Sequence, residues 1–194
     1  MRIAMIGSGY VGLVSGACLA DFGHAVTCVD TDRAKIDALL KGEIPIFEPG
    51  LDALVAANVK AGRLTFTTEL TGPVADADVV FIAVGTPSRR GDGHADLTYV
   101  HGAARAIAAA VKGFTVIVTK STVPVGTGDE VERIIRETTP GADVAVVSNP
   151  EFLREGAAID DFKRPDRIVI GLEDERARDV MTEVYRPLYL NQAP

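Results

Sequence analysis

The chain has 194 residues and a formal net charge of −7, from 20 Lys and Arg against 27 Asp and Glu. Its length suits one ordinary domain, and 47% hydrophobic with 24% charged residues excludes a disordered tail and a collagen-like rod. The acidic balance disfavours nucleic acid and anionic membranes as partners. No apolar run approaches the ~20 residues that cross a bilayer, so we expect a cytoplasmic protein without membrane association.

Six short segments are apolar almost throughout, which is typical of parallel strands covered on both faces: residues 2–6, 25–30, 64–67, 78–84, 114–120 and 143–148. Five segments between them place apolar residues three and four apart and predict helices: residues 11–22, 31–41, 51–61, 97–112 and 126–137. After residue 160 we expect a further strand over 167–171 and a further helix over 173–185. This alternation predicts a doubly wound, Rossmann-like α/β fold, with a mainly parallel sheet, helices on both faces and chemistry in the loops after the strands.

The run Gly7-Ser8-Gly9-Tyr10-Val11-Gly12 directly follows the first predicted strand and directly precedes the first predicted helix. In this context Gly7 permits a tight turn, Gly9 lets the backbone approach a pyrophosphate, and Gly12 allows close packing of helix on strand. The helix N-terminus then faces the anion. The motif predicts a dinucleotide site, with a glycine-rich turn that binds no ligand as the alternative.

Asp30 ends the second predicted strand, where its carboxylate can accept hydrogen bonds from ribose hydroxyls. An acid at this position repels the additional phosphate of NADP, so we predict NAD as the cofactor. Two nearby cations, Arg33 and Lys35, weaken this argument.

Two further motifs follow predicted strands. Gly85-Thr86-Pro87 precedes a polar loop, and the Thr86 hydroxyl can donate a hydrogen bond to a cofactor or remain solvated. The run Lys120-Ser121-Thr122-Val123-Pro124-Val125-Gly126 supplies a hydroxyl pair that can hold a nicotinamide, a ribose or a sugar, with a helix N-cap as the alternative. The charged residues of the polar loop are interpreted as solvated: Arg89, Arg90, Asp92 and His94.

The run Asn149-Pro150-Glu151-Phe152-Leu153-Arg154-Glu155-Gly156 follows the sixth predicted strand. If it is helical, Glu151 and Glu155 share one face, where burial and an adjacent charge can tune a pKa. A charged helix start is the alternative, and the residues alone favour it.

Four runs in chain order resemble the UDP-glucose/GDP-mannose dehydrogenase family: residues 6–12, 84–87, 120–126 and 149–156. Residues 89–96 and Gly156 are most similar to the bacterial UDP-glucose 6-dehydrogenases within it. The resemblance implies oxidation of the C6 alcohol of UDP-glucose to the carboxylate of UDP-glucuronate, with reduction of two NAD molecules. GDP-mannose or a UDP-N-acetylhexosamine is the alternative substrate, and a homo-oligomer is expected of the complete protein.

The same resemblance implies roles for individual residues. Glu151 is the implied catalytic acid or base, and Thr122 positions the water or hydroxyl that the chemistry uses. The implied NAD site comprises Gly7, Gly9, Tyr10, Val11, Gly12, Asp30, Lys35, Thr86, Thr122 and Glu155. The implied sugar site comprises Glu151, Phe152, Leu153, Arg154 and Glu155.

The family's nucleophilic cysteine lies in a Gly-Phe-Gly-Gly-Ser-Cys loop beyond a long central helix, and these 194 residues contain neither. Cys18 and Cys28 are expected to be buried packing thiols, and the absence of a metal-ligand spacing predicts no metal. We therefore expect residues 1–194 to be an NAD-binding domain that lacks the central helix and the C-terminal UDP-sugar-binding domain and is inactive alone. A non-catalytic NAD-binding or assembly module is the alternative.

Overall fold

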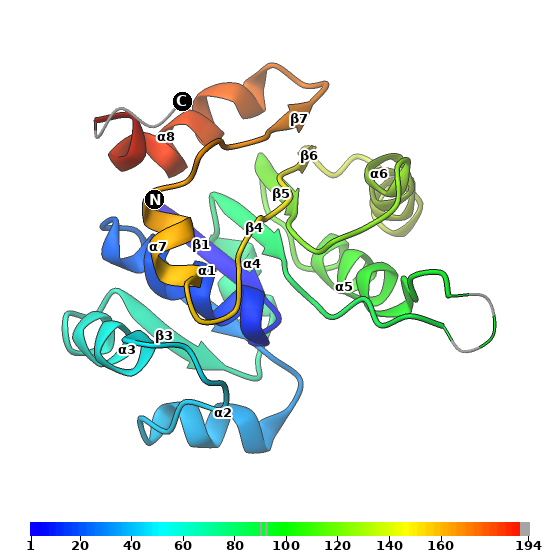
Figure 1. The fold of residues 1–194 in the computed structure, drawn as a ribbon. Helices are drawn as coiled ribbons and strands as arrows, with labels where there is room; N and C mark the ends of the chain where they lie inside the picture. Colours follow the sequence, from blue (N-terminus) through cyan, green and yellow to red (C-terminus); the bar gives the residue numbers. More distant parts are fainter. Residues whose placement is uncertain (90, 92, 191–194) are drawn as a thin grey trace.

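The computed structural model describes residues 1–89, 91 and 93–190 (Figure 1). These residues form one seven-stranded sheet from β1 (Arg2–Ile6), β2 (Ala25–Val29), β3 (Leu64–Thr67), β4 (Val79–Ile82), β5 (Thr115–Thr119), β6 (Val144–Ser148) and β7 (Gly171–Leu172). Their helices are α1 (Tyr10–Asp21), α2 (Arg33–Leu40), α3 (Leu51–Lys60), α4 (Thr71–Asp76), α5 (Thr98–Ala108), α6 (Thr127–Thr138), α7 (Ala158–Lys163) and α8 (Arg176–Leu190). Arg90 and Asp92, interpreted from the sequence as solvated, lie outside the described residues.

The strands lie in the order β3-β2-β1-β4-β5-β6-β7. Strand β1 pairs in parallel with β2 on one side and with β4 on the other, so the sheet grows in opposite directions from this point. The pairs β2 with β3, β4 with β5 and β5 with β6 are also parallel. Dinucleotides bind at the carboxyl ends of the strands where such a reversal occurs, which here are the ends of β1 and β4. The predicted doubly wound fold is confirmed.

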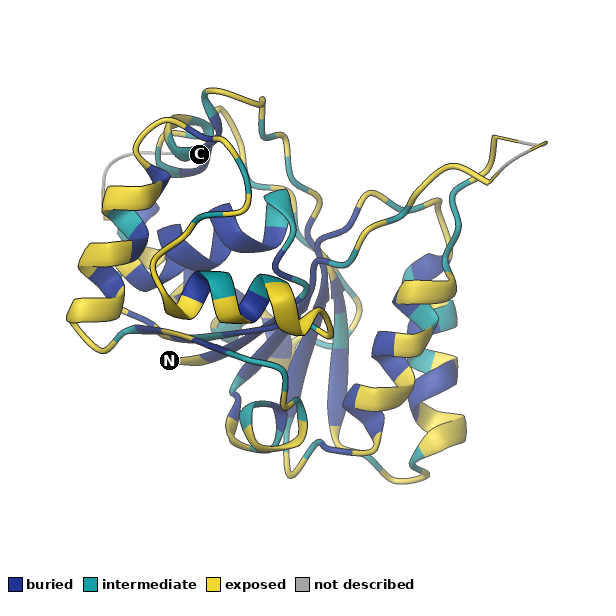
Figure 2. Ribbon diagram, turned by 90° about the horizontal axis from the view of Figure 1, so that it is seen from below, coloured by how far each residue is buried: buried dark blue, intermediate teal, exposed yellow. Residues whose placement is uncertain are grey.

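Helices cover both faces of the sheet (Figure 2). One core cluster, which includes Leu13 and Met181, joins the sheet to α1, α3, α7 and α8. The other, which includes Ile107 and Ile135, joins it to α4, α5 and α6. Every residue of β4 and β5 is buried, because both faces of these strands meet apolar side chains. This burial explains why the strands are apolar throughout in the sequence.

The C-terminal part of the fold differs from the prediction. A strand over 167–171 is wrong except at Gly171, because β7 has two residues and pairs antiparallel with β6. The preceding segment packs Ile168 against the core cluster instead of extending the ladder. Helix α8 begins at Arg176 rather than at residue 173, since the Asp174 side chain accepts the Arg176 N–H and ends the preceding turn.

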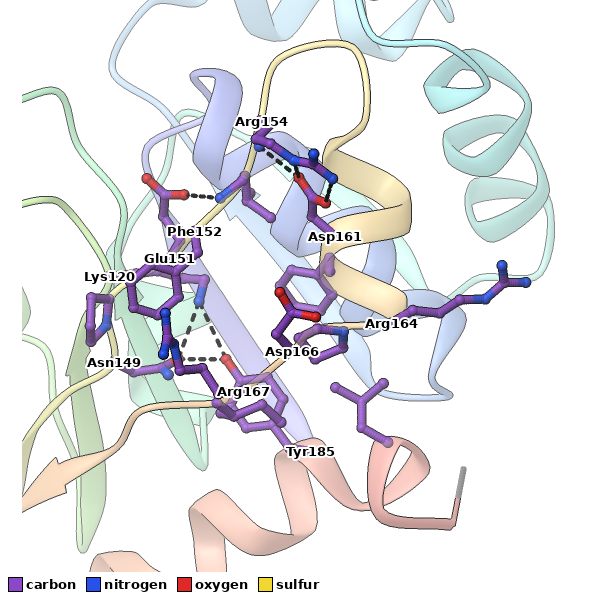
Figure 3. A pocket seen from close by; sticks show the side chains of 16 residues that line it. Lys120, Asn149, Glu151, Phe152, Arg154, Asp161, Arg164, Asp166, Arg167 and Tyr185 are labelled. Atoms are coloured by element: carbon purple, nitrogen blue, oxygen red, sulfur yellow. Dashed lines mark hydrogen bonds and ion pairs between the residues drawn. The ribbon is translucent and has the colours of Figure 1, made fainter. Parts of the chain in front are cut away.

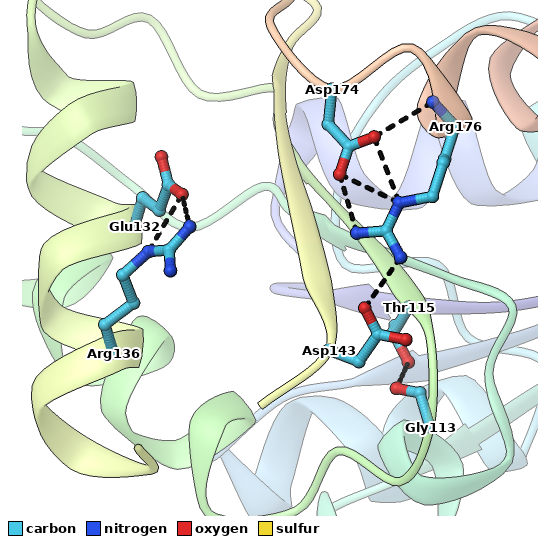
Figure 4. A network of polar contacts seen from close by, with 7 residues as sticks. All are labelled: Gly113, Thr115, Glu132, Arg136, Asp143, Asp174 and Arg176. Atoms are coloured by element: carbon cyan, nitrogen blue, oxygen red, sulfur yellow. Dashed lines mark hydrogen bonds and ion pairs between the residues drawn. The ribbon is translucent and has the colours of Figure 1, made fainter. Parts of the chain in front are cut away.

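A polar network joins the start of α8 to the sheet (Figure 4). The Arg176 guanidinium donates to Asp174 and, at 2.8 Å, to Asp143 Oδ1 just before β6. Its central carbon also lies 4.2 Å from the centre of the Phe114 ring. Exposed ion pairs of this kind stabilise a fold little, but the shared guanidinium fixes where α8 begins. A later residue of α8, Tyr185, enters the site described below.

Two short helices were not predicted. Helices α4 and α7 have six residues each, too few for a helical period to show in the sequence. The 15-residue α8 is the longest helix of the described residues. Within that part of the chain, no helix combines the length and apolar character needed to span a membrane.

Candidate functional site

The glycine turn between β1 and α1 has the geometry that its sequence predicts. Gly7 has a φ of +102°, and a Cβ there would lie 2.6 Å from the Ala83 carbonyl oxygen. A Cβ on Gly12 would lie 1.9 Å from the Gly7 carbonyl oxygen, so only glycine lets α1 approach the turn. Within the described residues, a Cβ on Gly9 would meet no heavy atom within 4 Å. Gly9 therefore leaves open space where a ligand can approach the backbone.

The first turn of α1 provides the donors for an anion. Gly9 is the N-cap residue, and the first turn, which begins with Tyr10 and Val11, contains no acidic residue. First-turn N–H groups have no acceptor within a helix and lie at the positive end of its dipole. The turn and helix together can bind a pyrophosphate, as the motif predicts.

Asp30 lies beside the glycine turn, directly after β2. Its Oδ2 accepts the Ser8 N–H at 2.8 Å and the Lys35 Nζ at 2.7 Å, and its Oδ1 accepts the Asp32 N–H at 3.0 Å. Burial acts to raise the pKa of Asp30, but these donors outweigh it and hold the pKa below its ordinary value. The group is thus a carboxylate at neutral pH, able to accept from ribose hydroxyls. Lys35, the cation that weakened the case for NAD, is paired with this carboxylate.

The loops after β4 and β5 meet at the same edge of the sheet. The Thr86 hydroxyl donates to the Thr122 carbonyl oxygen at 3.0 Å, and the Ser121 hydroxyl donates to the Val84 carbonyl oxygen at 2.7 Å. The two threonines that the sequence assigns to the cofactor site are therefore neighbours. The alternative that Ser121 or Thr122 caps a helix is wrong, because Gly126, with a φ of +87°, is the N-cap of α6.

The segment from residue 149 to 156 is not helical, so the condition for Glu151 and Glu155 to share a helix face is not met, and the charged helix start that the residues favoured is wrong. Glu151 Oε2 accepts the Leu153 N–H at 2.6 Å, and this local turn takes the place of helical hydrogen bonds. Glu155 is exposed, and it lies in the turn that precedes α7. Arg154 donates three hydrogen bonds to the Asp161 carboxylate of α7, from its backbone N–H, its Nε and its Nη2.

A cavity of about 410 Å³ lies between this segment, α7 and α8 (Figure 3). It is lined by polar, charged and aromatic side chains, which include Lys120, Asn149, Glu151, Phe152, Arg154, Asp161, Phe162, Arg167 and Tyr185. The Arg167 guanidinium carbon lies 5.5 Å from the centre of the exposed Phe152 ring. The cavity thus places the predicted sugar-site residues Glu151 to Arg154 along one wall, although Glu155 is not among its lining residues.

Three buried polar groups meet at the base of this wall. Lys120 Nζ lies 3.2 Å from Asn149 Oδ1 and 3.3 Å from the Tyr185 hydroxyl, which itself donates to Asn149 Oδ1. The ammonium also lies 5.5 Å from the centre of the Phe162 ring. Burial lowers the pKa of Lys120 to about 8, against the opposing effect of the Glu151 charge. Asn149 is thereby held in place two residues before Glu151.

Glu48 is a site residue that the sequence analysis missed. It is 6% exposed, and its carboxylate accepts from the Tyr10 hydroxyl at 2.5 Å and from the N–H groups of Gly156 and Ala158 at 2.8 Å. The signal available in the sequence was a lone acid within the otherwise uncharged run from residue 44 to 50. Tyr185 was also missed, and nothing in its helical context marks it.

The two cysteines are buried and reduced, as predicted. Burial raises the pKa of Cys18 and of Cys28 to about 12, so neither provides a thiolate nucleophile at neutral pH. Among residues 1–89, 91 and 93–190, no group of three or more His, Cys, Asp or Glu side chains is placed to hold a metal ion.

Comparison with protein families gives a match over almost the whole chain. Residues 1–189 match the model described as UDP-glucose/GDP-mannose dehydrogenase family, NAD binding domain. The UDP-glucose 6-dehydrogenase of Rhizobium meliloti is 78% identical over 196 residues, which cover 100% of this chain and 45% of the relative. That of Pseudomonas aeruginosa is 48% identical and is covered to 43% of its length.

Solved structures agree with this match. A UDP-glucose dehydrogenase from Pyrobaculum islandicum superposes with a TM-score of 0.91 at 44% identity, over 96% of this chain and 44% of that one. A ternary complex of GDP-mannose dehydrogenase from Pseudomonas aeruginosa superposes with a TM-score of 0.92 at 42% identity. This match covers 97% of this chain and 44% of that one. The chain spans less than half the length of these relatives.

Proposed function

Because the chain belongs to the UDP-glucose/GDP-mannose dehydrogenase family and forms its NAD-binding domain, we propose that it supplies the NAD site and part of the sugar site of a UDP-glucose 6-dehydrogenase. The reaction oxidises the C6 alcohol of UDP-glucose to the carboxylate of UDP-glucuronate in two hydride transfers. The observation that carries the choice of substrate is the 78% identity to a UDP-glucose 6-dehydrogenase along the whole chain.

The glycine turn fits NAD because of the open space at Gly9 and the donors of the first turn of α1. Asp30 binds the ribose hydroxyls, and Thr86 and Thr122 lie where the nicotinamide end reaches the edge of the sheet. When bound, NAD supplies the acceptor for hydride. The remaining residues assigned to this site are Gly7, Tyr10, Val11, Gly12, Lys35 and Glu155.

On the sugar side, Glu151 acts as the acid or base that moves the proton of the C6 hydroxyl, and Thr122 positions the hydroxyl or water. Phe152, Leu153, Arg154 and Glu155 line the sugar. The 410 Å³ cavity that Phe152, Leu153 and Arg154 line, and the fixed position of Asn149, support the assignment of these three residues. Both cysteines of this chain are buried, so we expect the second oxidation to need a nucleophile from elsewhere in the full-length protein and the chain alone to be inactive.

The fold of this chain does not distinguish between related nucleotide sugars. The chain superposes on a GDP-mannose dehydrogenase with a TM-score of 0.92 and on a UDP-glucose dehydrogenase with a TM-score of 0.91. GDP-mannose, a UDP-N-acetylhexosamine and a non-catalytic NAD-binding role are therefore the rival outcomes of the test below.

The test assays the full-length protein that contains this chain with NAD and each nucleotide sugar, and identifies the product by mass spectrometry. We expect UDP-glucuronate from UDP-glucose, and a fall in kcat of about a hundredfold or more in Glu151→Gln with unchanged NAD affinity. Purified 194-residue chain should give no product. A preference for another nucleotide sugar, or full activity in Glu151→Gln, would overturn the proposal.

A further inference from the structure

Glu48 joins two segments that are far apart in the sequence. One of its partners, Tyr10, is the first residue of α1 and belongs to the glycine turn region. Its other partners, the N–H groups of Gly156 and Ala158, lie more than a hundred residues away, where residues 149–156, the sugar-site segment, end and α7 begins. A buried carboxylate is stable only when hydrogen bonds replace its water, and these donors do so. The three contacts therefore depend on one another.

The contact with Tyr10 lies next to the groups that bind the cofactor. The Tyr10 N–H is in the first turn of α1, where a pyrophosphate binds, while the hydroxyl of the same residue donates to Glu48. The hydroxyl also lies 3.4 Å from the Arg154 carbonyl oxygen, so Tyr10 reaches the sugar-site segment directly as well. Fixing the backbone of Tyr10 thus restricts the ring, the carboxylate and the segment together.

We propose that Glu48 is a positioning residue that couples the two halves of the active site, so that NAD binding at the glycine turn orders the sugar-site segment through Tyr10 and Glu48. This inference rests on the proposed function, because it needs NAD at the turn. Coupling of this kind is reciprocal, so a nucleotide sugar held by the segment also strengthens NAD binding.

A second anchor of the same segment provides a matched control. Arg154 is bound to Asp161 by its backbone N–H and guanidinium, which ties the segment to α7 but not to the glycine turn. Breaking this anchor loosens the segment at Arg154 and leaves the contacts of Glu48 with Tyr10, Gly156 and Ala158 intact. The control separates loss of order from loss of coupling.

The test measures backbone amide hydrogen exchange of the chain by NMR, with and without saturating NAD. In the wild type we expect NAD to slow exchange at Gly156 and Ala158 by about tenfold, in the usual range for coupled sites. In Tyr10→Phe and Glu48→Gln, each measured at an NAD concentration that saturates that variant, this ratio should fall below about twofold. In Asp161→Asn the exchange rates of Gly156 and Ala158 should rise both with and without NAD. The ratio between the two conditions should stay at its wild-type value.

Tyr10→Phe keeps the ring in place, so the test does not depend on whether Glu48→Gln folds. A wild-type ratio retained in Tyr10→Phe would overturn the inference, as would protection of the glycine turn without any change at Gly156 and Ala158. Failure of NAD to protect the glycine turn in the wild type would overturn the proposed function, and the inference with it.

Discussion

The cofactor side and the sugar side of this site are built in different ways. Most of the cofactor side comes from one continuous stretch, from β1 through the glycine turn and α1 to Asp30 after β2, to which later loops add Thr86 and Thr122. The sugar side combines separate pieces: Glu48, Lys120, the segment 149–156, α7 and Tyr185 of α8. The first depends on local backbone geometry and the second on buried polar contacts between distant residues. The two sides should therefore fail in different ways when they are changed.

The largest effect is expected from Gly12→Ala, because its Cβ would lie 1.9 Å from the Gly7 carbonyl oxygen, a backbone atom that cannot move aside as a flexible side chain can. The free energy of unfolding should fall by about 3 kcal/mol or more. Gly9→Ala is the matched control: it should change stability by less than about 1 kcal/mol but weaken NAD binding by about tenfold or more. Urea unfolding and calorimetric titration measure the two quantities. Equal stability of the two variants would contradict this account of the turn.

Lys120 should make stability depend on pH. Its folded pKa of about 8 lies below the ordinary value of 10.5, so the unfolded chain binds more protons between these values. Stability contributed by this group therefore rises as pH increases through that range. Between about pH 7 and pH 10, wild type should gain on the order of 2 to 3 kcal/mol relative to Lys120→Met.

Lys120→Met keeps every other titrating group, so the difference between the two proteins isolates the contribution of Lys120. In this variant the Tyr185 hydroxyl still donates a hydrogen bond to Asn149 Oδ1. The comparison uses urea unfolding of both proteins across the range. Parallel pH profiles would show that the ammonium is not buried as described.

Asp30→Ala should change cofactor preference. Loss of its charged hydrogen bonds should weaken NAD binding by on the order of 1 to 3 kcal/mol. The loss of NADP binding should be smaller, because Lys35 is no longer paired with Asp30. Asp32→Ala is the control, because Asp32 caps α2 through the Lys35 N–H and has no assigned role toward the cofactor. Competitive titration measures both ligands, and equal losses for NAD and NADP would contradict the role of Asp30.

A smaller effect is expected from Tyr185→Phe. The variant removes the hydroxyl that contacts Asn149 and Lys120, and should lower the free energy of unfolding by about 1 to 2 kcal/mol. Tyr189→Phe, on the same helix but 42% exposed, should change it by less than about 0.5 kcal/mol. Denaturant unfolding of the pair checks this, and similar small changes in both would show that the buried network adds little.

The sequence was informative where geometry is local. The turn at Gly7, Gly9 and Gly12 and the acid at Asp30 were predicted because each requirement falls within one strand–turn–helix–strand stretch. Glu48 was not, because its role depends on donors more than a hundred residues away. Neither helical interpretation of the segment with Glu151 and Glu155 matches the structure, for a related reason.

A spacing of four residues indicates a helix only if the backbone makes helical hydrogen bonds, and here Glu151 itself takes the Leu153 N–H. The short β7 illustrates the same limit at the level of the fold. Apolar residues before it pack against the core without pairing as a strand, and no local pattern distinguishes the two arrangements.

The most direct test of the account is a calorimetric titration of this chain with NAD, with NADP as comparison. Because every residue assigned to the cofactor lies within these 194 residues, the account predicts saturable NAD binding by the 194-residue chain and weaker NADP binding. Cooperative urea unfolding of the same sample establishes that the chain is folded. A folded chain that binds no NAD, or that prefers NADP, would contradict the central claim that these residues form a self-contained NAD site.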